Sequence, residues 1–459
     1  MKKSGKNNGS GVSQKKHNTK ASRSQDANAS PKDKNQGRSM GTRQPAPRQS
    51  VPHPGGAVRP AAMPAGDAFG ACLAAASREL APGHELDIRS LEALAEMGYP
   101  TECKVKQRAM EIFKHKHGLK GELHKLTPSP LSRGYRTTSK RRARFSQGKL
   151  ELFIEHRQQS KLEPDMHADI FAMIQDILSA SHYQVLSRHL NYCIIRGSYE
   201  KCAVIMNVDH VDGSVVRKLK QLAVAFQERE RRIVSCFMYL DETKSDYYLE
   251  SRRPEQVLAF KKLFGSDFLD ICVDDMRLLY PPTVFSQVNE SILPEFTATI
   301  RELLDLKTDM RLLDLYCGYG LLGLTAAQHV NSVIGMDIEG PAVKAAIGNA
   351  AHQCKGKNIK FIAAAITAGS LREKLPPPVA GEVILLDPPR QGTSPGVIEE
   401  LARRQPARVL HIFCGTDEIP RELKLWEEAD YMSTHIVPLD MFPGSMNLET
   451  LVLLEPRNE

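Results

Sequence analysis

From Pro281 onward, short apolar runs alternate with segments of helical periodicity, and this alternation constrains the fold more than any other feature of the chain. Continuous apolar runs are typical of strands buried on both faces of a parallel sheet, with helices covering those faces. The pattern therefore predicts a doubly wound, Rossmann-like α/β domain over residues 281–459. The expected strands are 310–318, 332–337, 383–387 and 407–414, the expected helices are 321–330, 340–351 and 397–404, and 431–440 with 448–456 would close the sheet as an antiparallel pair.

Upstream, residues 127–280 mix the two patterns and predict an α+β domain. Residues 67–126 show helical spacing of apolar side chains, for example Ile88, Leu91 and Leu94, and predict a small basic helical segment. Within the α+β domain, strands are expected at 150–156, 190–198, 202–208 and 232–240, and helices at 166–180 and 215–228.

Residues 1–66 are rich in Lys, Ser, Asn, Gly, Gln and Pro and hold few large apolar side chains. Such a segment buries too little apolar surface to offset its ordering entropy, so a disordered basic tail is predicted. No apolar run reaches the roughly 18 residues that a membrane span needs. The nine cysteines are scattered and never form CxxC, which predicts neither a disulfide framework nor a metal site. A cytoplasmic protein is expected.

The net charge of +8 is concentrated in two places. Residues 1–50 hold twelve Lys and Arg against two Asp and Glu, and residues 101–150 hold fourteen against three. Clustered cations favour a polyanionic partner such as RNA, because contacts between Lys or Arg and phosphates release counterions. The alternative for the second cluster is a solvated charged surface.

The loop after the first strand of the α/β domain, DLYCGYGLLG, has glycines at 318, 320 and 323. This spacing fits a dinucleotide site, so an NAD-linked oxidoreductase is one interpretation. Asp314 before the glycines and Asp337 at the end of the second strand favour S-adenosylmethionine instead, because such acids can organise the loop and accept ribose hydroxyls. The loop alone leaves both cofactors open.

Two further strand ends carry chemical groups. Asp387 ends the fourth strand and is followed by two prolines that turn the chain out over the pocket. Methyltransferases that act on exocyclic amines place an aromatic residue after these prolines. Arg390 stands there instead, which argues against an exocyclic amine as the methyl acceptor. Cys414 ends the next strand and fits either a buried packing residue or a nucleophile.

Five stretches, in order, resemble the tRNA/rRNA (uracil-5)-methyltransferase family: FSQVN (285–289), DLYCGYG (314–320), DPPRQG (387–392), the strand ending in Cys414, and DMFPGSMNLE (440–449). The resemblance covers roughly residues 281–459. It implies a class I, S-adenosylmethionine-dependent enzyme that methylates carbon 5 of a uridine in rRNA or tRNA. By the same similarity, the residues that hold the cofactor would be Gln287, Tyr316, Gly318, Gly320, Asp337 and Asp387.

The resemblance also implies a covalent mechanism with Cys414 and Glu449 as the catalytic pair. Carbon 5 of uracil is a weak nucleophile, so a thiolate adds to carbon 6 and creates an enolate that accepts the methyl group. Glu449 would then remove the carbon 5 proton, and the thiolate would leave by elimination.

Four positions depart from the family pattern: the neighbours of the cysteine are Phe413 and Gly415, Asn447 stands two residues before the glutamate, and Leu321 stands in the first loop where asparagine is common. These changes keep a second interpretation open, an RNA-binding factor with weakened or lost catalysis. The cysteine cluster of an iron–sulfur centre and an N-terminal all-β RNA-binding domain are not found in the sequence. The basic segment 101–145 is therefore predicted to contact RNA, through Arg133, Tyr135, Arg136, Arg141 and Arg142. Alternatively, Tyr135 packs in the core.

Overall fold

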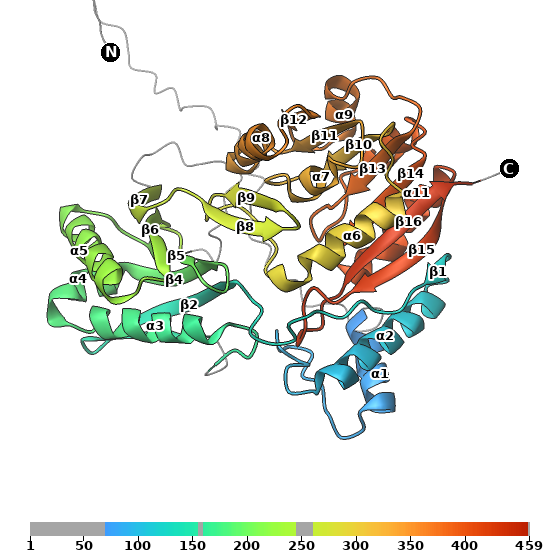
Figure 1. The fold of residues 1–459 in the computed structure, drawn as a ribbon. Helices are drawn as coiled ribbons and strands as arrows, with labels where there is room; N and C mark the ends of the chain where they lie inside the picture. Colours follow the sequence, from blue (N-terminus) through green and yellow to red (C-terminus); the bar gives the residue numbers. More distant parts are fainter. Residues whose placement is uncertain (1–68, 155–158, 245–259, 458–459) are drawn as a thin grey trace, which may run out of the picture. The chain divides into compact units, whose positions relative to one another are not determined.

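The computed structural model describes residues 69–154, 159–244 and 260–457 (Figure 1). These residues form an eight-stranded, a six-stranded and a two-stranded sheet. The tail predicted at 1–66 lies outside the described residues, and so do the last two residues of the strand predicted at 150–156.

The eight-stranded sheet has the strand order β1-β15-β16-β14-β13-β10-β11-β12. Its five central and far-edge strands are parallel: β10 (Arg311–Leu315), β11 (Ser332–Asp337), β12 (Asn358–Ala363), β13 (Glu382–Leu386) and β14 (Arg408–Phe413). β16 (Glu449–Pro456) runs antiparallel to both β14 and β15 (Tyr431–Leu439), and β1 (Glu122–Leu123) is parallel to β15. The predicted α/β fold with its closing antiparallel pair is confirmed; β12 was not predicted.

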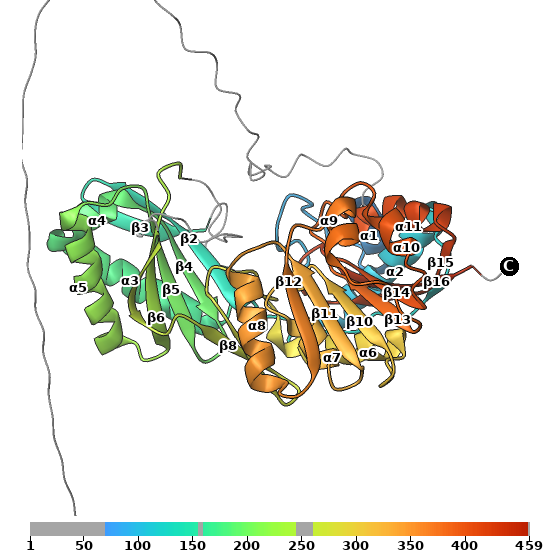
Figure 2. The ribbon, with the colours of Figure 1, turned by 90° about the horizontal axis from the view of Figure 1, so that it is seen from above.

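Both faces of this sheet are buried. Leu312 and Leu313 are adjacent on β10 but belong to different hydrophobic clusters, because side chains alternate between the faces of a strand. One cluster includes α6 (Leu293–Leu304), α7 (Leu321–Ala326) and α8 (Pro341–Gln353), and the other α9 (Ala368–Lys374), α10 (Val397–Ala402) and α11 (Ile419–Glu428). Figure 2 shows these two helix layers on opposite sides of the strands. Burial on both faces explains the continuous apolar runs.

The predicted helical segment 67–126 forms two helices, α1 (Phe69–Leu80) and α2 (Tyr99–Lys116), that share the second cluster with the sheet. The helical interpretation of Ile88 and Leu91 was wrong: residues 81–98 contain turns, and these two side chains are 59% and 80% exposed. Pro82 and Gly83 end α1, the glycine at φ +95°. None of the described helices combines the length and apolar character that crossing a membrane requires.

The six-stranded sheet has the order β3-β2-β4-β5-β6-β7. The predicted strands β4 (Leu190–Gly197), β5 (Cys202–Val208) and β6 (Ile233–Leu240) are confirmed, and so are α3 (Asp165–Leu178) and α5 (Gly213–Arg229). β3 (Lys149–Phe153) matches the described part of its prediction. The elements that were not predicted are β2 (Thr138–Ser146), β7 (Phe260–Gly265), α4 (Gln184–His189) and the hairpin of β8 (Leu269–Val273) and β9 (Met276–Tyr280).

Candidate active site

The loops after four parallel strands meet at one edge of the eight-stranded sheet. β10 pairs in parallel with β11 and β13, and β13 with β14, so their carboxyl ends lie at the same edge. Tyr316 follows β10, Asp337 ends β11, Asp387 follows β13 and Cys414 follows β14. The topology thus places four of the predicted site residues at one edge.

Cys414 and Glu449 are neighbours across two antiparallel strands. Phe413 of β14 is paired with Thr450 of β16, so the next residue of β14 faces the first residue of β16. Glu449 is 2% exposed, whereas Cys414 is partly exposed. The two residues predicted to act together are therefore adjacent at the sheet edge, although they lie far apart in the sequence.

Burial and negative neighbours hold protons on this pair. Burial, together with the charges of Glu449 and Asp387, raises the pKa of the Cys414 thiol to about 12, and Arg390 opposes this increase. Burial and then Asp387 raise the pKa of Glu449 to about 8, again against an opposing effect of Arg390. Arg390 is thus the cation that favours the ionised form of both groups.

Two further acids extend this group. Burial raises the pKa of Asp387 to about 7, with Asp337 adding to the effect. Burial also raises the pKa of Asp314 to about 7, although its Oδ2 accepts a hydrogen bond from the Gly323 N–H at 2.8 Å. We call Asp314, Asp387 and Glu449 the strand-end acids. Buried carboxyls with raised pKa values favour a cationic ligand that would compensate their charge.

A cavity of about 40 Å³ is lined by two of the strand-end acids, Asp314 and Asp387. Its volume suits about one water molecule, so a ligand of nucleoside size requires its lining to open. Phe285 is 59% exposed and is the lining side chain with the most room to move. The lining residues are Phe285, Gln287, Asp314, Tyr316, Cys317, Gly318, Tyr319, Leu321, Leu322 and Asp387.

The glycine loop, residues 316–320, has left-handed backbone conformations, as its glycines suggest. Tyr316, Gly318 and Gly320 have φ values of +65°, +54° and +89°. A Cβ on Gly320 would lie 2.9 Å from Leu324 Cδ1 and 3.1 Å from Phe361 Cζ, so only glycine fits there. The Gly318 N–H donates to Asp337 Oδ2 at 2.7 Å, which ties the loop to the end of β11. Gly320 and Asp337 support the loop and do not line the cavity.

The FSQVN stretch follows β9 and is held in place by Arg196 of β4. Arg196 is 1% exposed and donates to the carbonyl oxygens of Pro282 and Val284 and, at 2.6 Å, to Ser286 Oγ. These bonds fix the chain immediately before Gln287, which is 8% exposed and lines the cavity.

The loop that leads into Glu449 is held by a buried ionic group from α2. Lys106 Nζ donates to Asp440 Oδ1 at 2.7 Å and to the Phe442 carbonyl at 3.1 Å, and it pairs with Glu102 at 3.1 Å. Glu102 also accepts the Gly444 N–H at 2.5 Å. The side chains of Lys106, Glu102 and Asp440 are 0% exposed. We call these three residues the loop anchor.

Tyr135 does not contact RNA but packs in the core, which was the alternative interpretation, and the partly exposed Arg133 is bound within the protein. Arg133 Nη2 binds Glu102 Oε2 and the carbonyls of Leu94 and Met97, each at 3.0 Å. Tyr135 is 0% exposed, and its hydroxyl donates to the Pro443 carbonyl at 2.9 Å. Both side chains are used inside the protein, where they support the loop before Glu449.

The prediction for Arg141 was also wrong, whereas Arg136 and Arg142 remain partly exposed. Arg141 is 7% exposed and forms a two-bond ion pair with Glu163, at 3.0 and 2.5 Å. Arg136 Nε donates to the Thr138 carbonyl at 3.1 Å. The Arg142 guanidinium lies 5.5 Å from the centroid of the Tyr192 ring and lines a second cavity.

Sequence reasoning missed two groups at the site, Phe285 and Arg390. Phe285 was noted only as part of a motif, and Arg390 only as a departure from another enzyme class. The signals were present: an aromatic residue before Gln287, and a cation three residues after Asp387. A Cβ added to Gly415 would lie 3.2 Å from the Arg390 carbonyl oxygen. The DPPR loop therefore packs against the end of the strand that leads to Cys414.

Known proteins resemble this chain in sequence and in fold. The family model described as tRNA (Uracil-5-)-methyltransferase matches residues 233–376. An uncharacterized RNA methyltransferase of Lactobacillus johnsonii is 26% identical over 389 residues, 80% of this chain and 82% of its own length. One of Thermosynechococcus vestitus is 35% identical over 201 residues, 43% of this chain, but the match spans only 42% of that relative.

Among solved structures, the tRNA (uracil-54, C5)-methyltransferase of Pyrococcus abyssi, in complex with S-adenosyl-L-homocysteine, is similar with a TM-score of 0.58 and 18% identity. The similarity covers 80% of this chain and 86% of that one. The fold and the strand-end site define an α/β domain of the methyltransferase type. The chain is thus similar to the tRNA (uracil-5-)-methyltransferase family over residues 233–376 and to an RNA methyltransferase over most of its length.

Proposed function

We propose that the protein methylates carbon 5 of a uridine in RNA, with S-adenosylmethionine as methyl donor and Cys414 as covalent nucleophile. The observation that carries this proposal is the pairing of Phe413 with Thr450. It brings Cys414 and Glu449 together at the sheet edge that also carries the glycine loop. A thiol beside a buried carboxyl supplies the two groups that addition and elimination at a pyrimidine require.

The residues present fit this cofactor. When bound, S-adenosylmethionine supplies an electrophilic methyl group on a sulfonium. The buried Asp314 and the partly exposed Asp387 have pKa values raised to about 7, so a cationic ligand would favour their ionised forms. Gln287, Tyr316 and Gly318 line the same cavity. Asp337 accepts from Gly318 and holds the loop in shape.

Cys414 would attack carbon 6 of the uracil as a thiolate. In the ligand-free protein its pKa is raised to about 12, so the thiol is protonated until the site changes. Arg390, which favours the thiolate, and a bound cationic cofactor would lower that pKa. The new S–C6 bond would make carbon 5 nucleophilic, so that carbon 5 takes the methyl group while the bond between that methyl group and the sulfonium sulfur breaks and leaves a neutral thioether.

Glu449 would complete the reaction. Its carboxylate takes the carbon 5 proton, the C5–C6 double bond re-forms and the S–C6 bond breaks, which frees the cysteine. A pKa raised to about 8 makes Glu449 a stronger base than an exposed glutamate. Since a duplex hides the face of the ring from the thiolate, the target would be an unpaired or flipped-out uridine.

RNA contact is proposed at a basic cavity of about 390 Å³ in the six-stranded sheet and its helices. Arg142, Arg188 and Lys244 line it together with the aromatic rings of Phe145 and Tyr192. The Arg188 guanidinium lies 5.7 Å from the Phe145 centroid. Guanidinium groups beside aromatic rings suit phosphates and unstacked bases. Of the residues predicted to bind RNA, Arg142 is the one that this cavity retains.

Methyl transfer to total RNA tests the proposal. RNA from cells that lack the protein would be incubated with the enzyme and S-adenosylmethionine labelled in the methyl group, then digested to nucleosides. We expect label in 5-methyluridine, and sequencing of the modified site would identify rRNA or tRNA as the substrate. Label in another nucleoside would contradict the proposal. Binding of RNA without any transfer would favour an RNA-binding factor that has lost catalysis.

A further inference from the structure

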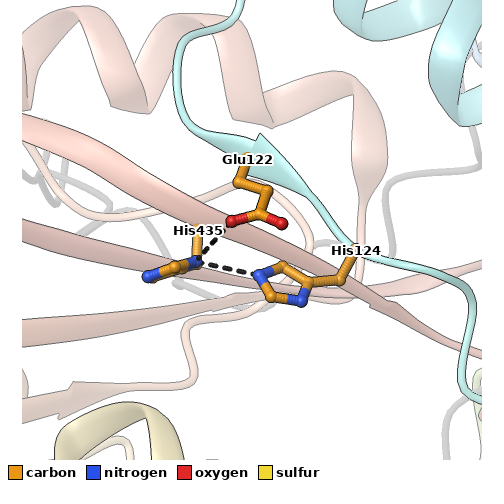
Figure 3. A group of neighbouring side chains, drawn as sticks. All are labelled: Glu122, His124 and His435. Atoms are coloured by element: carbon orange, nitrogen blue, oxygen red, sulfur yellow. Dashed lines mark hydrogen bonds and ion pairs between the residues drawn. The ribbon is translucent and has the colours of Figure 1, made fainter.

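Glu122, His124 and His435 form a cluster outside the candidate active site (Figure 3). His124 Nε2 lies 2.8 Å from His435 Nδ1, and Glu122 Oε2 lies 3.8 Å from the same nitrogen. One ligand atom from each residue lies within 4.8 Å of the others. Figure 3 shows the three side chains pointing toward one another, two from the β1 segment and one from β15.

The backbone aligns these side chains. β1 is parallel to β15, with Glu122 opposite His435 and Leu123 opposite Ile436, and the His124 N–H continues the ladder by donating to the Ile436 carbonyl at 2.9 Å. Residues two apart on a strand share one face, so Glu122 and His124 project to the same side. Leu123 projects to the other side and packs against the hydrophobic core.

Two backbone irregularities, one in β15 and one before β1, allow the three side chains to meet. The pairing of β15 with β16 shifts register between Ser433 and His435, and a β-bulge of this kind redirects the side chain that follows it. Gly121 precedes Glu122 at φ +88°, and a Cβ there would lie 2.9 Å from the Ser433 carbonyl. Only glycine therefore allows the β1 segment to approach the bulge this closely.

The ligand chemistry matches a borderline metal ion. Two imidazole nitrogens and a carboxylate oxygen are a common donor set for Zn²⁺, which leaves one tetrahedral position for water. With Zn–N bonds of about 2.0–2.1 Å, two ligand nitrogens lie roughly 3.4 Å apart, so the rings would separate by about half an ångström. Glu122 and His435, whose side chains are 70% and 37% exposed, have room for this movement.

We propose that Glu122, His124 and His435 bind one Zn²⁺ ion that fastens the β1 segment to β15. The sequence predicted no metal site, because the ligands are separated by more than 300 residues: His124 and His435 lie 311 positions apart. β15 continues directly into Asp440 and the loop before Glu449, so the ion would stabilise the strand that supports this loop. The site is structural and does not depend on the proposed RNA methylation.

Zinc titration of the full-length, untagged, chelator-treated protein tests this site. His17 and His53 of the tail would be changed to Gln in every sample, so that tail histidines do not bind the ion. Wild type in this background should bind one equivalent of Zn²⁺ and unfold at a higher temperature with zinc than without. Cobalt, as a spectroscopic probe, should show the absorption of a tetrahedral ion.

His435→Gln and His124→Gln should each weaken zinc binding at least tenfold and abolish the zinc-dependent rise in unfolding temperature. His115→Gln, at an exposed position of α2, should behave as wild type. Circular dichroism would establish that the variants are folded. Equal zinc binding in wild type and both ligand variants, or no binding by folded wild type, would overturn the proposal.

Discussion

The loop anchor and the strand-end acids both place ionisable side chains inside the protein, yet their electrostatics differ. In the loop anchor, Lys106 pairs with Asp440 at 2.7 Å and with Glu102 at 3.1 Å, and Arg133 pairs with Glu102 at 3.0 Å. The carboxylates raise the pKa of Lys106 above its usual range even though burial lowers it. Here every buried charge has a partner of opposite sign.

Among the strand-end acids, by contrast, burial raises all three pKa values. Asp314 and Asp387 reach about 7 and Glu449 about 8, and each acid is affected mainly by burial, with negative neighbours adding to the effect. In a paired cluster each charge compensates its partner, so removing one partner destabilises the fold. Acids whose burial is not compensated cost stability in their ionised form and are typical of a ligand-binding or reactive site. Carboxyl groups thus occur in both clusters, and the presence or absence of compensating cations distinguishes the structural cluster from the reactive one.

The largest effect is expected at Cys414. Cys414→Ala should lower methyl transfer at least about 1000-fold, as removal of a covalent nucleophile does. The free energy of unfolding should change by less than about 1 kcal/mol, because the lost sulfur is partly exposed. Labelled-methyl assays and urea unfolding measure the two effects. Cys272→Ala, at an exposed cysteine of β8, should leave both unchanged. Full activity of Cys414→Ala would remove it from the mechanism.

Asp440→Asn should destabilise the protein. Removing one partner of a buried ion pair costs about 3 to 5 kcal/mol, because it leaves the other charge poorly compensated. Here the ammonium of Lys106 would keep only Glu102 as a charged partner. Urea unfolding measures the change, and Asp309→Asn at an exposed position is the matched control. An unchanged free energy of unfolding would mean that the loop anchor does not hold the loop.

Asp387→Asn, the same substitution in the other group, should stabilise the ligand-free protein at pH 8. An acid whose pKa is higher in the folded state takes up protons on folding, so its contribution to stability falls as pH rises, here from about 4 to about 7. The gain at pH 8 should reach up to about 4 kcal/mol, and it should vanish near pH 4. Unfolding at several pH values measures it, while cofactor binding should weaken.

A lower free energy of unfolding for Asp387→Asn at pH 8 would contradict the proposed difference between the loop anchor and the strand-end acids. Its result is meaningful only beside Asp440→Asn, since both substitutions remove one negative charge and change little volume.

The smallest effect is a shift in pH dependence. Arg390 lowers the pKa of both Cys414 and Glu449. Arg390→Gln should therefore move the rise of kcat/KM with pH to more alkaline values, by about one unit or less. Arg403→Gln, at the exposed residue that follows α10, should leave the profile in place. A profile of Arg390→Gln that matches wild type would show that neither titration limits the reaction.

The same contrast explains what the sequence could predict. The sheet that carries the strand-end acids was predictable, because strands buried on both faces are continuous apolar runs that end in distinctive residues such as Asp387 and Cys414. The loop anchor was not predictable. Lys106 and Arg133 add to the positive charge of 101–150 in the sequence, and only folding brings Glu102 and Asp440 against them.

Tyr135 shows the same limit. One aromatic residue among arginines is typical of an RNA-binding surface, but this ring is buried and its hydroxyl binds the Pro443 carbonyl, more than 300 residues away. Long-range pairing of polar groups leaves no local signal in a sequence. The edge position of β1, two residues long, is hidden for the same reason.

The formation of a covalent complex with RNA that contains 5-fluorouridine tests the central claim most directly. Fluorine on carbon 5 cannot be removed as a proton, so the S–C6 bond should persist after methyl transfer. With S-adenosylmethionine, wild type and Cys272→Ala should give a complex that survives denaturation, and Cys414→Ala should give none. An undiminished complex in Cys414→Ala, or none in wild type that binds both RNA and cofactor, would contradict the account.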